Sequence, residues 1–295
     1  MVEEVAQPRS RSWPETRWGN PDMNRRRATF ITAGIDVGSV SSKACIMADG
    51  EILAYADVRT GFDSARKALK CALEVVDMSE DRLDYCVGTG YGRVNVPVAD
   101  RSLTEIACHA RGANFIYGPR VRTVLDVGGQ DIKVIRCDEK GKVTNFLMND
   151  KCAAGTGRGM EVFADLVGVP IEDVGRRSFE VKEEPPAVSS VCVVYAKSEA
   201  LGLLKKGSSV QEVLAAYCRA MAERIYSLVE KIDVTPEFAV TGGMGKNPGV
   251  MDRLMPMVGL ERMKTTWEPQ IAGAVGAALF GYALCQRGRA TKKKS

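Results

Sequence analysis

The sequence predicts an α/β protein built from two similar lobes around a nucleotide-binding cleft. Two stretches, residues 30–56 and 121–146, each have the pattern strand, tight turn, strand, turn, strand. In both stretches an aspartate, Asp36 or Asp126, ends the first strand, and a glycine two residues later opens the turn. This shared order of elements, which is not a tandem repeat of sequence, is what predicts two lobes.

Length and hydropathy set the expected domain boundaries. A chain of 295 residues with 45% hydrophobic residues can form two lobes, each with its own core. We expect the first lobe at 28–120 and the second at 121–270, with helices at 64–76 and 160–167 after the hairpins. The uncharged stretch at about 271–286 is shorter than the ~20 residues of a membrane span. Its alanines and glycines predict a tightly packed helix that returns to the first lobe.

The net charge of +4 resides in the two ends of the chain. Residues 1–27 contain six arginines against four acids, and residues 287–295 contain five basic residues and no acid. The body between these ends therefore carries a net charge of −3. A nucleic-acid or membrane partner is not indicated by such a distribution.

The first 27 residues are expected to form an extended basic arm, and residues 287–295 a basic tail. The arm lacks the apolar segment of a secretion signal, so the nine cysteines are expected as unpaired thiols in a reducing cytoplasm. Trp13 and Trp18, set among arginines, suit docking onto an acidic partner face. A solubilising tail is the alternative.

The turn after each aspartate has the chemistry of a phosphate site. Gly38 in the first lobe, and Gly128 and Gly129 in the second, allow backbone amides to approach phosphate oxygens. The carboxylates of Asp36 and Asp126 cannot bind phosphate directly, but they can hold the hydrated Mg²⁺ that neutralises it. Further candidate contacts to ATP beside the turns are Ser39, Ser41, Ser42 and Lys43.

A third glycine-rich segment, V-T-G-G-M-G-K-N-P-G-V at 240–250, reads as strand, turn and helix start. Gly242 and Gly243 would let the backbone lie flat against an adenosine. One strand-end aspartate before a glycine is usually only a turn. Two matching copies together with this third segment favour an ATPase cleft of the actin-like type. The remaining candidate nucleotide contacts are Lys246, Asn247 and Gln270.

The attacking water has two candidate partners, Glu105 and Gln130, between which the sequence does not choose. His109, the single histidine, follows on the helix expected after Thr104. Its spacing predicts an ordinary hydrogen-bonded helix residue.

Cys152 stands before a glycine-rich loop and a helix in N-D-K-C-A-A-G-T-G-R, residues 149–158. The free amides of a helix start attract anions, here either a phosphate or a negative group held by the thiolate. The chain has no C-x-x-C, so a self-contained four-cysteine cluster is not indicated. The other cysteines, Cys192 excepted, are expected to be buried core thiols.

Four motifs together resemble one protein family. They are G-I-D-V-G-S-V-S-S-K, L-D-V-G-G-Q-D-I-K, N-D-K-C-A-A-G-T-G-R and V-T-G-G-M-G-K-N-P-G-V. From about Phe30 to about Ala283 the chain resembles the ATPases that activate 2-hydroxyacyl-CoA dehydratases and benzoyl-CoA reductases. The stretches at 89–97, 151–166 and 268–280 look most like the small ATPase subunits of class I benzoyl-CoA reductases.

The resemblance implies an actin-like (acetate and sugar kinase/Hsp70/actin) fold that binds ATP and Mg²⁺. It also implies a dimer with one [4Fe–4S] cluster between protomers, ligated in this chain by Cys152 and Cys192. The implied function is ATP-driven transfer of low-potential electrons from ferredoxin to catalytic subunits that reduce the aromatic ring of benzoyl-CoA. A related but non-identical ATPase protomer is expected as the dimer partner.

Three alternatives share the cleft motifs. A homodimeric activator of a 2-hydroxyacyl-CoA dehydratase would also explain the two cysteines. A small-molecule kinase of the actin-like superfamily, or a non-enzymatic actin-like assembly protein, would leave Cys152 and Cys192 unexplained.

Overall fold

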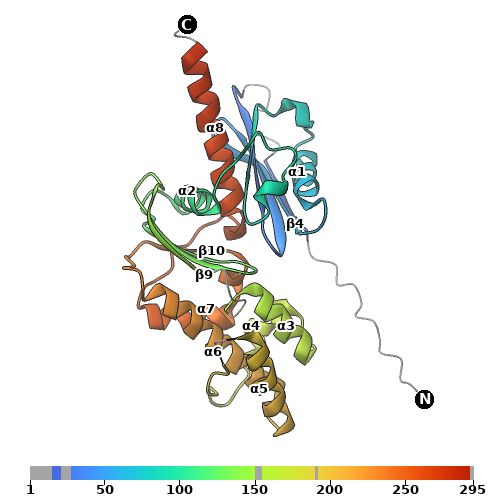
Figure 1. Ribbon diagram of the computed structural model, residues 1–295, viewed down its shortest axis with the longest axis vertical. Helices are drawn as coiled ribbons and strands as arrows, with labels where there is room; N and C mark the ends of the chain where they lie inside the picture. Colours follow the sequence, from blue (N-terminus) through green and yellow to red (C-terminus); the bar gives the residue numbers. More distant parts are fainter. Residues whose placement is uncertain (1–14, 21–27, 150–154, 190–191, 293–295) are drawn as a thin grey trace, which may run out of the picture.

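The computed structural model describes residues 15–20, 28–149, 155–189 and 192–292. Figure 1 shows two α/β lobes arranged along the long axis of the molecule, with the last helix, α8, running along the first lobe.

The first lobe is built on a six-stranded sheet of order β1-β4-β3-β2-β5-β6. β2 (Ile31–Val37) lies inside it and is buried along its whole length. β3 (Ser41–Ala48) pairs antiparallel with β2 on one side, and β5 (Tyr85–Thr89) pairs parallel with it on the other. β4 (Glu51–Arg59) and β6 (Arg101–Ser102) lie outside β3 and β5, respectively.

The second lobe repeats this arrangement in a four-stranded sheet of order β10-β7-β8-β9. β7 (Thr123–Val127) takes the place of β2, with β8 (Ile132–Cys137) and β9 (Val143–Asn149) antiparallel in succession on one side. β10 (Phe238–Thr241) pairs parallel with β7 on the other side. The two similar hairpin units expected from the sequence are therefore confirmed.

The equivalence of the lobes extends to single residues at the strand ends. Across β2 and β3, Asp36 pairs with Lys43. The same register across β7 and β8 places Asp126 opposite Lys133. Each lobe thus offers one carboxylate and one ammonium group at the end of its inner strand pair.

The helices divide into three layers with the sheets between them (Figure 1). α1 (Ser64–Val75) covers one face of the first sheet, and α8 (Ala272–Lys292) covers the other. α2 (Glu105–Tyr117) packs on α8 and also on the second sheet, so it lies between the lobes. The far face of the second sheet carries the other helices: α3 (Gly157–Val167), α4 (Ile171–Arg177), α5 (Val193–Lys205), α6 (Val210–Val229) and α7 (Pro248–Val258).

Local sequence sets the ends of several helices. At the start of α6 the Ser209 hydroxyl accepts a hydrogen bond from the Glu212 amide, and the Glu212 carboxylate accepts one from the Ser209 amide. α3 ends at Gly168, whose φ of +66° is a left-handed conformation that glycine adopts without a steric penalty. Four short 3₁₀ turns complete the described part of the chain: η2 (Glu80–Arg82), η3 (Arg93–Asn95), η4 (Gly243–Lys246) and η5 (Pro269–Ile271).

α8 approaches its neighbours so closely that backbone meets backbone. A Cβ atom on Gly276 would lie 1.8 Å from the carbonyl oxygen of Cys108 in α2. A Cβ atom on Gly34 in β2 would lie 2.0 Å from the carbonyl oxygen of Ala274. The expected tightly packed helix is confirmed, although it runs six residues further than expected, to Lys292. Its small residues are required by close contact with α2 and β2.

Part of the N-terminal segment joins the first sheet as β1 (Thr16–Gly19), which pairs antiparallel with β4. The Trp18 ring stacks on Tyr55 at a centroid distance of 5.7 Å and meets Trp267 edge-on at 5.1 Å. The expectation that Trp18 anchors a partner protein is therefore wrong, because its aromatic surface is used within this chain. Trp13 lies outside the described residues.

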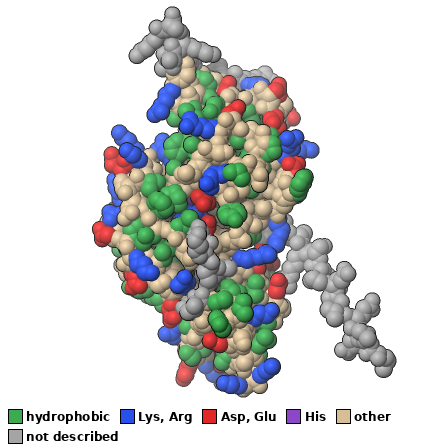
Figure 2. Space-filling view, viewed as in Figure 1, with side chains coloured by type: hydrophobic (Ala, Val, Ile, Leu, Met, Phe, Trp, Pro, Cys, Tyr) green, Lys and Arg blue, Asp and Glu red, His purple; other side chains and the backbone are tan. Residues whose placement is uncertain are grey.

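Two surface properties bear on the partner classes. In the parts of the chain that the structure describes, no helix is both long and apolar enough to span a bilayer. On the face shown in Figure 2, basic and acidic side chains are interspersed over the described surface.

Candidate functional site

Three buried side chains meet where the lobes join. Asp36 is the second-last residue of β2 in the first lobe, Asp126 is the second-last residue of β7 in the second, and His109 projects from α2 between them. The Nε2 atom of His109 lies 3.7 Å from Oδ2 of Asp36, and its Nδ1 atom lies 3.4 Å from Oδ1 of Asp126. His109 is therefore not the ordinary helix residue expected from the sequence, because both of its ring nitrogens face acidic groups of different lobes.

Lys133 is the cationic centre of the same site. Its Nζ atom lies 2.6 Å from Oδ1 of Asp131 and 3.3 Å from Oδ2 of Asp126. Oε2 of Glu105, in the first turn of α2, lies 3.6 Å away. Glu105 thus lies beside Lys133, a residue that the sequence analysis did not single out.

The pKa values within this cluster follow from burial opposed by charge. Burial by itself would raise the pKa of Asp126, but the charges of His109 and Lys133 and a 2.8 Å hydrogen bond from Thr241 lower it to about 2. Burial would lower the pKa of Lys133, but the surrounding carboxylates outweigh it and raise that pKa. Burial raises the pKa of Glu105, against the opposing charge of Lys133. Asp126 and Lys133 are therefore both charged at neutral pH.

The cleft carries more negative than positive charge. Glu105, Asp126 and Asp131 surround Lys133, and Asp36 lies beside His109. Within the described part of the chain, no group of three or more His, Cys, Asp or Glu side chains is arranged to chelate a metal ion. Carboxylates of this kind could hold a Mg²⁺ ion through its water molecules. Asp36 is the better-placed carboxylate, since Lys133 and Thr241 already engage Asp126.

The glycine turns of the two lobes have the same geometry and touch each other. The Gly38 amide donates to the Ser41 carbonyl at 3.1 Å, and the Gly128 amide donates to the Asp131 carbonyl at 3.0 Å. A Cβ atom on Gly129 would lie 2.7 Å from Oγ of Ser39 in the opposite turn. Glycine at 129 therefore permits the close approach of the two turns.

Three other candidate ligand-binding residues near these turns differ in where their side chains lie. The Ser42 hydroxyl lies 2.9 Å from the Thr60 hydroxyl and 2.8 Å from the Ser64 hydroxyl, inside the first lobe and not in the cleft. The Nζ atom of Lys43 donates to the Ser41 carbonyl at 3.2 Å. Gln130 is exposed at the tip of the second turn, where it is free to reach a ligand.

The third glycine segment brings Lys246 and Gln270 together. The Nζ atom of Lys246 donates to Oε1 of Gln270 and to Oε2 of Glu268, both at 2.8 Å. A Cβ atom on Gly243 would lie 3.2 Å from Nε2 of Gln270, so the bare backbone faces this group. Gly242 has a φ of +82°, and Asn247 accepts a hydrogen bond from the Val250 amide as the N-cap of α7. Asn247 thus has a structural role in ending the turn.

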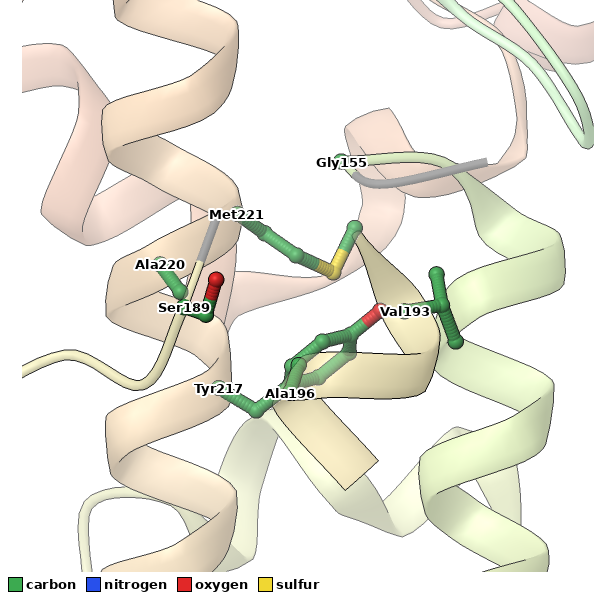
Figure 3. Close-up of a pocket in the computed structure, with 7 residues that line it drawn as sticks. All are labelled: Gly155, Ser189, Val193, Ala196, Tyr217, Ala220 and Met221. Atoms are coloured by element: carbon green, nitrogen blue, oxygen red, sulfur yellow. The ribbon is translucent and has the colours of Figure 1, made fainter. Parts of the chain in front are cut away.

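Cys192 lies directly before α5 as its N-cap residue and is partly exposed. Cys152 lies outside the described residues. Gly155, three residues after Cys152, and Val193, next to Cys192, line one small pocket over Tyr217 and Met221 of α6 (Figure 3). The segments that follow the two cysteines therefore converge.

The start of α3, five residues after Cys152 in the sequence, is hydrogen-bonded to the cleft. At the start of α3 the Gly157 amide donates to the Gly128 carbonyl at 2.9 Å, and the Arg158 amide donates to the Gly129 carbonyl at 2.8 Å. These carbonyls belong to the phosphate-type turn of the second lobe. A movement of that turn would therefore displace the first residues of α3.

The other cysteines behave as core thiols. Cys45, Cys71, Cys86, Cys108, Cys137 and Cys218 are buried, and Cys285 is partly buried. Burial raises the pKa of Cys86 and of Cys108 to about 12, so these thiols stay protonated and unreactive.

Sequence reasoning did not identify His109, Lys133, Thr241 or Glu268 as site residues. Two of them carried a signal in the internal symmetry of the chain. Lys133 follows Asp126 by seven residues, as Lys43 follows Asp36. Thr241 precedes a positive-φ glycine at the end of β10, as Thr89 does at the end of β5.

Comparison with known proteins identifies the family. The activator of lactoyl-CoA dehydratase from Anaerotignum propionicum is 39% identical over 261 residues, 88% of this chain and 100% of that protein. A benzoyl-CoA reductase subunit from Thauera aromatica is 29% identical over 264 residues, 85% of this chain and 93% of that protein. The activator of the 2-hydroxyisocaproyl-CoA dehydratase from Clostridium difficile, solved with bound ADPNP, superposes with a TM-score of 0.82 and 35% identity, covering 89% of this chain and 98% of that one.

The actin-like fold expected from the sequence is confirmed by these structural neighbours. The profile of one family matches residues 33–281, which include both glycine turns, the third glycine segment and both cysteine segments. This chain belongs to the BadF/BadG/BcrA/BcrD ATPase family.

Proposed function

We propose that this chain is an ATP-hydrolysing, [4Fe–4S]-bearing electron activator that drives electrons from ferredoxin to catalytic subunits that reduce the ring of benzoyl-CoA. The carrying observation is the connection from the second-lobe turn, through the first amides of α3, to the segment after Cys152. That segment converges with the one after Cys192 at a single pocket (Figure 3). Hydrolysis at the turns would thereby change the position of both cysteine segments.

The donor set fits a cluster shared between two protomers. A [4Fe–4S] cluster usually takes four thiolates, and in the sequence Cys152 precedes α3 and Cys192 precedes α5. Two protomers would therefore supply the four ligands. When bound, the cluster would supply one-electron transfer, while α3 and α5 would direct their amide ends toward its negative charge.

The coupling free energy expected between the ATP site and the cluster limits how far ATP can shift the reduction potential of the cluster. A coupling of ~1–3 kcal/mol between two sites corresponds to about 40–130 mV for one electron. Reduction of an aromatic ring demands more than such a shift. We therefore also expect the cleft to close when ATP binds and to reopen after hydrolysis, and this change would prevent electrons from returning to the donor.

A second candidate function has the same cleft chemistry: activation of a 2-hydroxyacyl-CoA dehydratase by a homodimer. The 39% identity to a lactoyl-CoA dehydratase activator, against 29% to a benzoyl-CoA reductase subunit, favours it. The motif stretches at 89–97, 151–166 and 268–280 favour the reductase partner.

The cluster assignment predicts a loss of iron in two single variants. Cys152→Ala and Cys192→Ala, purified without oxygen, are each expected to lose the bridging cluster because each protomer then offers one thiolate. Cys71→Ala is the matched control, since Cys71 is buried in the first lobe. Iron and sulfide analysis makes the measurement, and wild-type iron content in Cys152→Ala would rule out the assignment.

The two partner classes predict different assemblies. We expect the chain expressed alone without oxygen to retain iron poorly, and co-expression with a related ATPase subunit and the catalytic subunits of a benzoyl-CoA reductase to restore both iron and ring reduction. Native mass and iron content make the measurement. A stable homodimer with a full cluster that activates a 2-hydroxyacyl-CoA dehydratase would instead establish the second candidate.

A further inference from the structure

We infer that His109 is a positioning residue that sets the separation of the two cleft carboxylates by contacting one from each lobe. The inference rests on the ATPase cleft described above and assigns a role to its one histidine. It concerns the spacing of Asp36 and Asp126, and it does not depend on which partner the protein serves.

The imidazole of His109 lies beside the carboxylates of both Asp36 and Asp126. No other described side chain is seen to contact both of them. The Nε2 atom of the imidazole faces Asp36 at 3.7 Å and its Nδ1 atom faces Asp126 at 3.4 Å. Nδ1 is buried and makes no hydrogen bond to any residue that the structure describes. A buried nitrogen without a partner is unfavourable, so a small approach of the Asp126 carboxylate would gain a hydrogen bond.

The two carboxylates differ in what else holds them. Asp126 has Lys133 and the Thr241 hydroxyl within hydrogen-bond reach. For Asp36, the basic side chain that lies within 4 Å among the described residues is His109 rather than a lysine or an arginine. The position of Asp36 relative to the second lobe therefore depends chiefly on the imidazole.

The helix that carries His109 is well placed to fix this distance. α2 packs against α8 through the backbone contact at Gly276, so it cannot slide without a clash. The start of α8 closes the remaining side of the group. A Cβ atom on Gly273 would lie 2.5 Å from Oδ2 of Asp36 and 2.9 Å from Nε2 of His109. The imidazole is thus confined between two carboxylates and a glycine.

A fixed distance between Asp36 and Asp126 would fix the positions of the water molecules around a Mg²⁺ ion in the cleft and of the attacking water. Groups that orient the ligands of a metal site change metal affinity by about 10–100-fold when they are removed. Misplacement of catalytic groups by about 1 Å lowers turnover by about 100-fold. Removal of His109 should therefore act on both quantities while leaving contacts to the adenosine unchanged.

The test uses the full holoprotein with two substitutions. His109→Ala is expected to lower kcat for ATP by about 100-fold, with a much smaller change in KM. In calorimetric titrations with the non-hydrolysable analogue ADPNP, it should also raise the Mg²⁺ concentration needed for tight binding by about 10-fold. His109→Gln keeps a polar side chain that can reach one carboxylate, so it should recover part of both losses.

Control variants separate this inference from the cleft assignment. Cys108→Ala changes the preceding residue of α2 and is expected to leave kcat and the Mg²⁺ dependence at wild-type values. A His109→Ala protein with wild-type kcat and Mg²⁺ dependence would overturn the inference. If His109→Ala fails to fold, wild-type values in His109→Gln together with wild-type values in His109→Asn overturn it. Full turnover in Asp36→Asn and Asp126→Asn would instead refute the cleft itself.

Discussion

Asp36→Asn and Asp126→Asn are each expected to lower ATP turnover by about 100-fold or more while leaving iron content unchanged. Asparagine keeps the size of the side chain but removes the negative charge. At Asp36 the lost charge would orient the hydrated Mg²⁺ beside the phosphates. At Asp126 the carboxylate pairs with Lys133 and accepts the Thr241 hydrogen bond, so asparagine would leave Lys133 paired with Asp131 and Glu105 alone.

The measurement is steady-state phosphate release by the anaerobically purified protein, with iron analysis on the same samples. Asp138→Asn is the matched control, because Asp138 lies in the exposed turn between β8 and β9 and binds backbone amides there. It should turn over ATP at the wild-type rate. Wild-type turnover in both cleft variants would contradict the two-lobed ATPase site.

The lowered pKa of Asp126 predicts how its contribution to stability and to the ATPase rate depends on pH. Its folded-state pKa of about 2 lies below the ordinary value of 3.8, so its ionised form stabilises the folded protein above pH ~4. This contribution is lost only as the pH falls through about 2. Changes in ATPase rate between pH 5 and 9 should therefore not reflect titration of Asp126.

Gly276→Ala is expected to destabilise the protein by about 1–3 kcal/mol, although alanine is the better helix former. The added methyl group would lie 1.8 Å from the Cys108 carbonyl oxygen, and neither this Cβ nor the backbone oxygen can rotate away. α8 and α2 would have to separate, and this separation would also disturb Asp36 and His109. The free energy of unfolding, measured by denaturant titration under anaerobic conditions, tests the effect.

Gly288→Ala supplies a matched control in the same helix. Nothing lies within 4 Å of the position that its Cβ would take. The substitution should therefore stabilise the helix by up to about 1 kcal/mol, which is the difference in helix propensity between alanine and glycine. Equal stability of Gly276→Ala and the wild-type protein would show that the α2–α8 contact does not limit stability.

Much of the fold could be predicted from the sequence because its signals are local. The second turn of each predicted unit lies at Asp49-Gly50 or Lys140-Gly141, with a positive φ at the glycine, and strands lie on either side. The helix expected at 64–76 is α1, and the helix expected from residue 160 begins three residues earlier, at Gly157. Such an early start is hard to predict, since glycines at a helix start carry no apolar period.

The candidate site was predicted less completely, for a geometric reason. Alternation along a strand determines which side chains share a face of the sheet, but it does not determine which of them reach the cleft between the lobes. Ser42 was grouped with the phosphate turn, yet its hydroxyl faces Thr60 and Ser64. Trp18 was assigned to a partner, yet it pairs with aromatic rings about 37 and 249 residues away in the chain.

The amino-acid sequence alone predicts the two-lobed fold, the paired aspartate–glycine turns and the two isolated cysteines, because each depends on residues that are close together in the chain. Only the tertiary structure decided that His109 faces Asp36 and Asp126, and that Lys133 joins Glu105 to the second lobe. These contacts bring β2, which ends at Val37, to α2, β7 and β8, the first of which begins only at Glu105. They form only when α2 is held between the two sheets by its contact with α8.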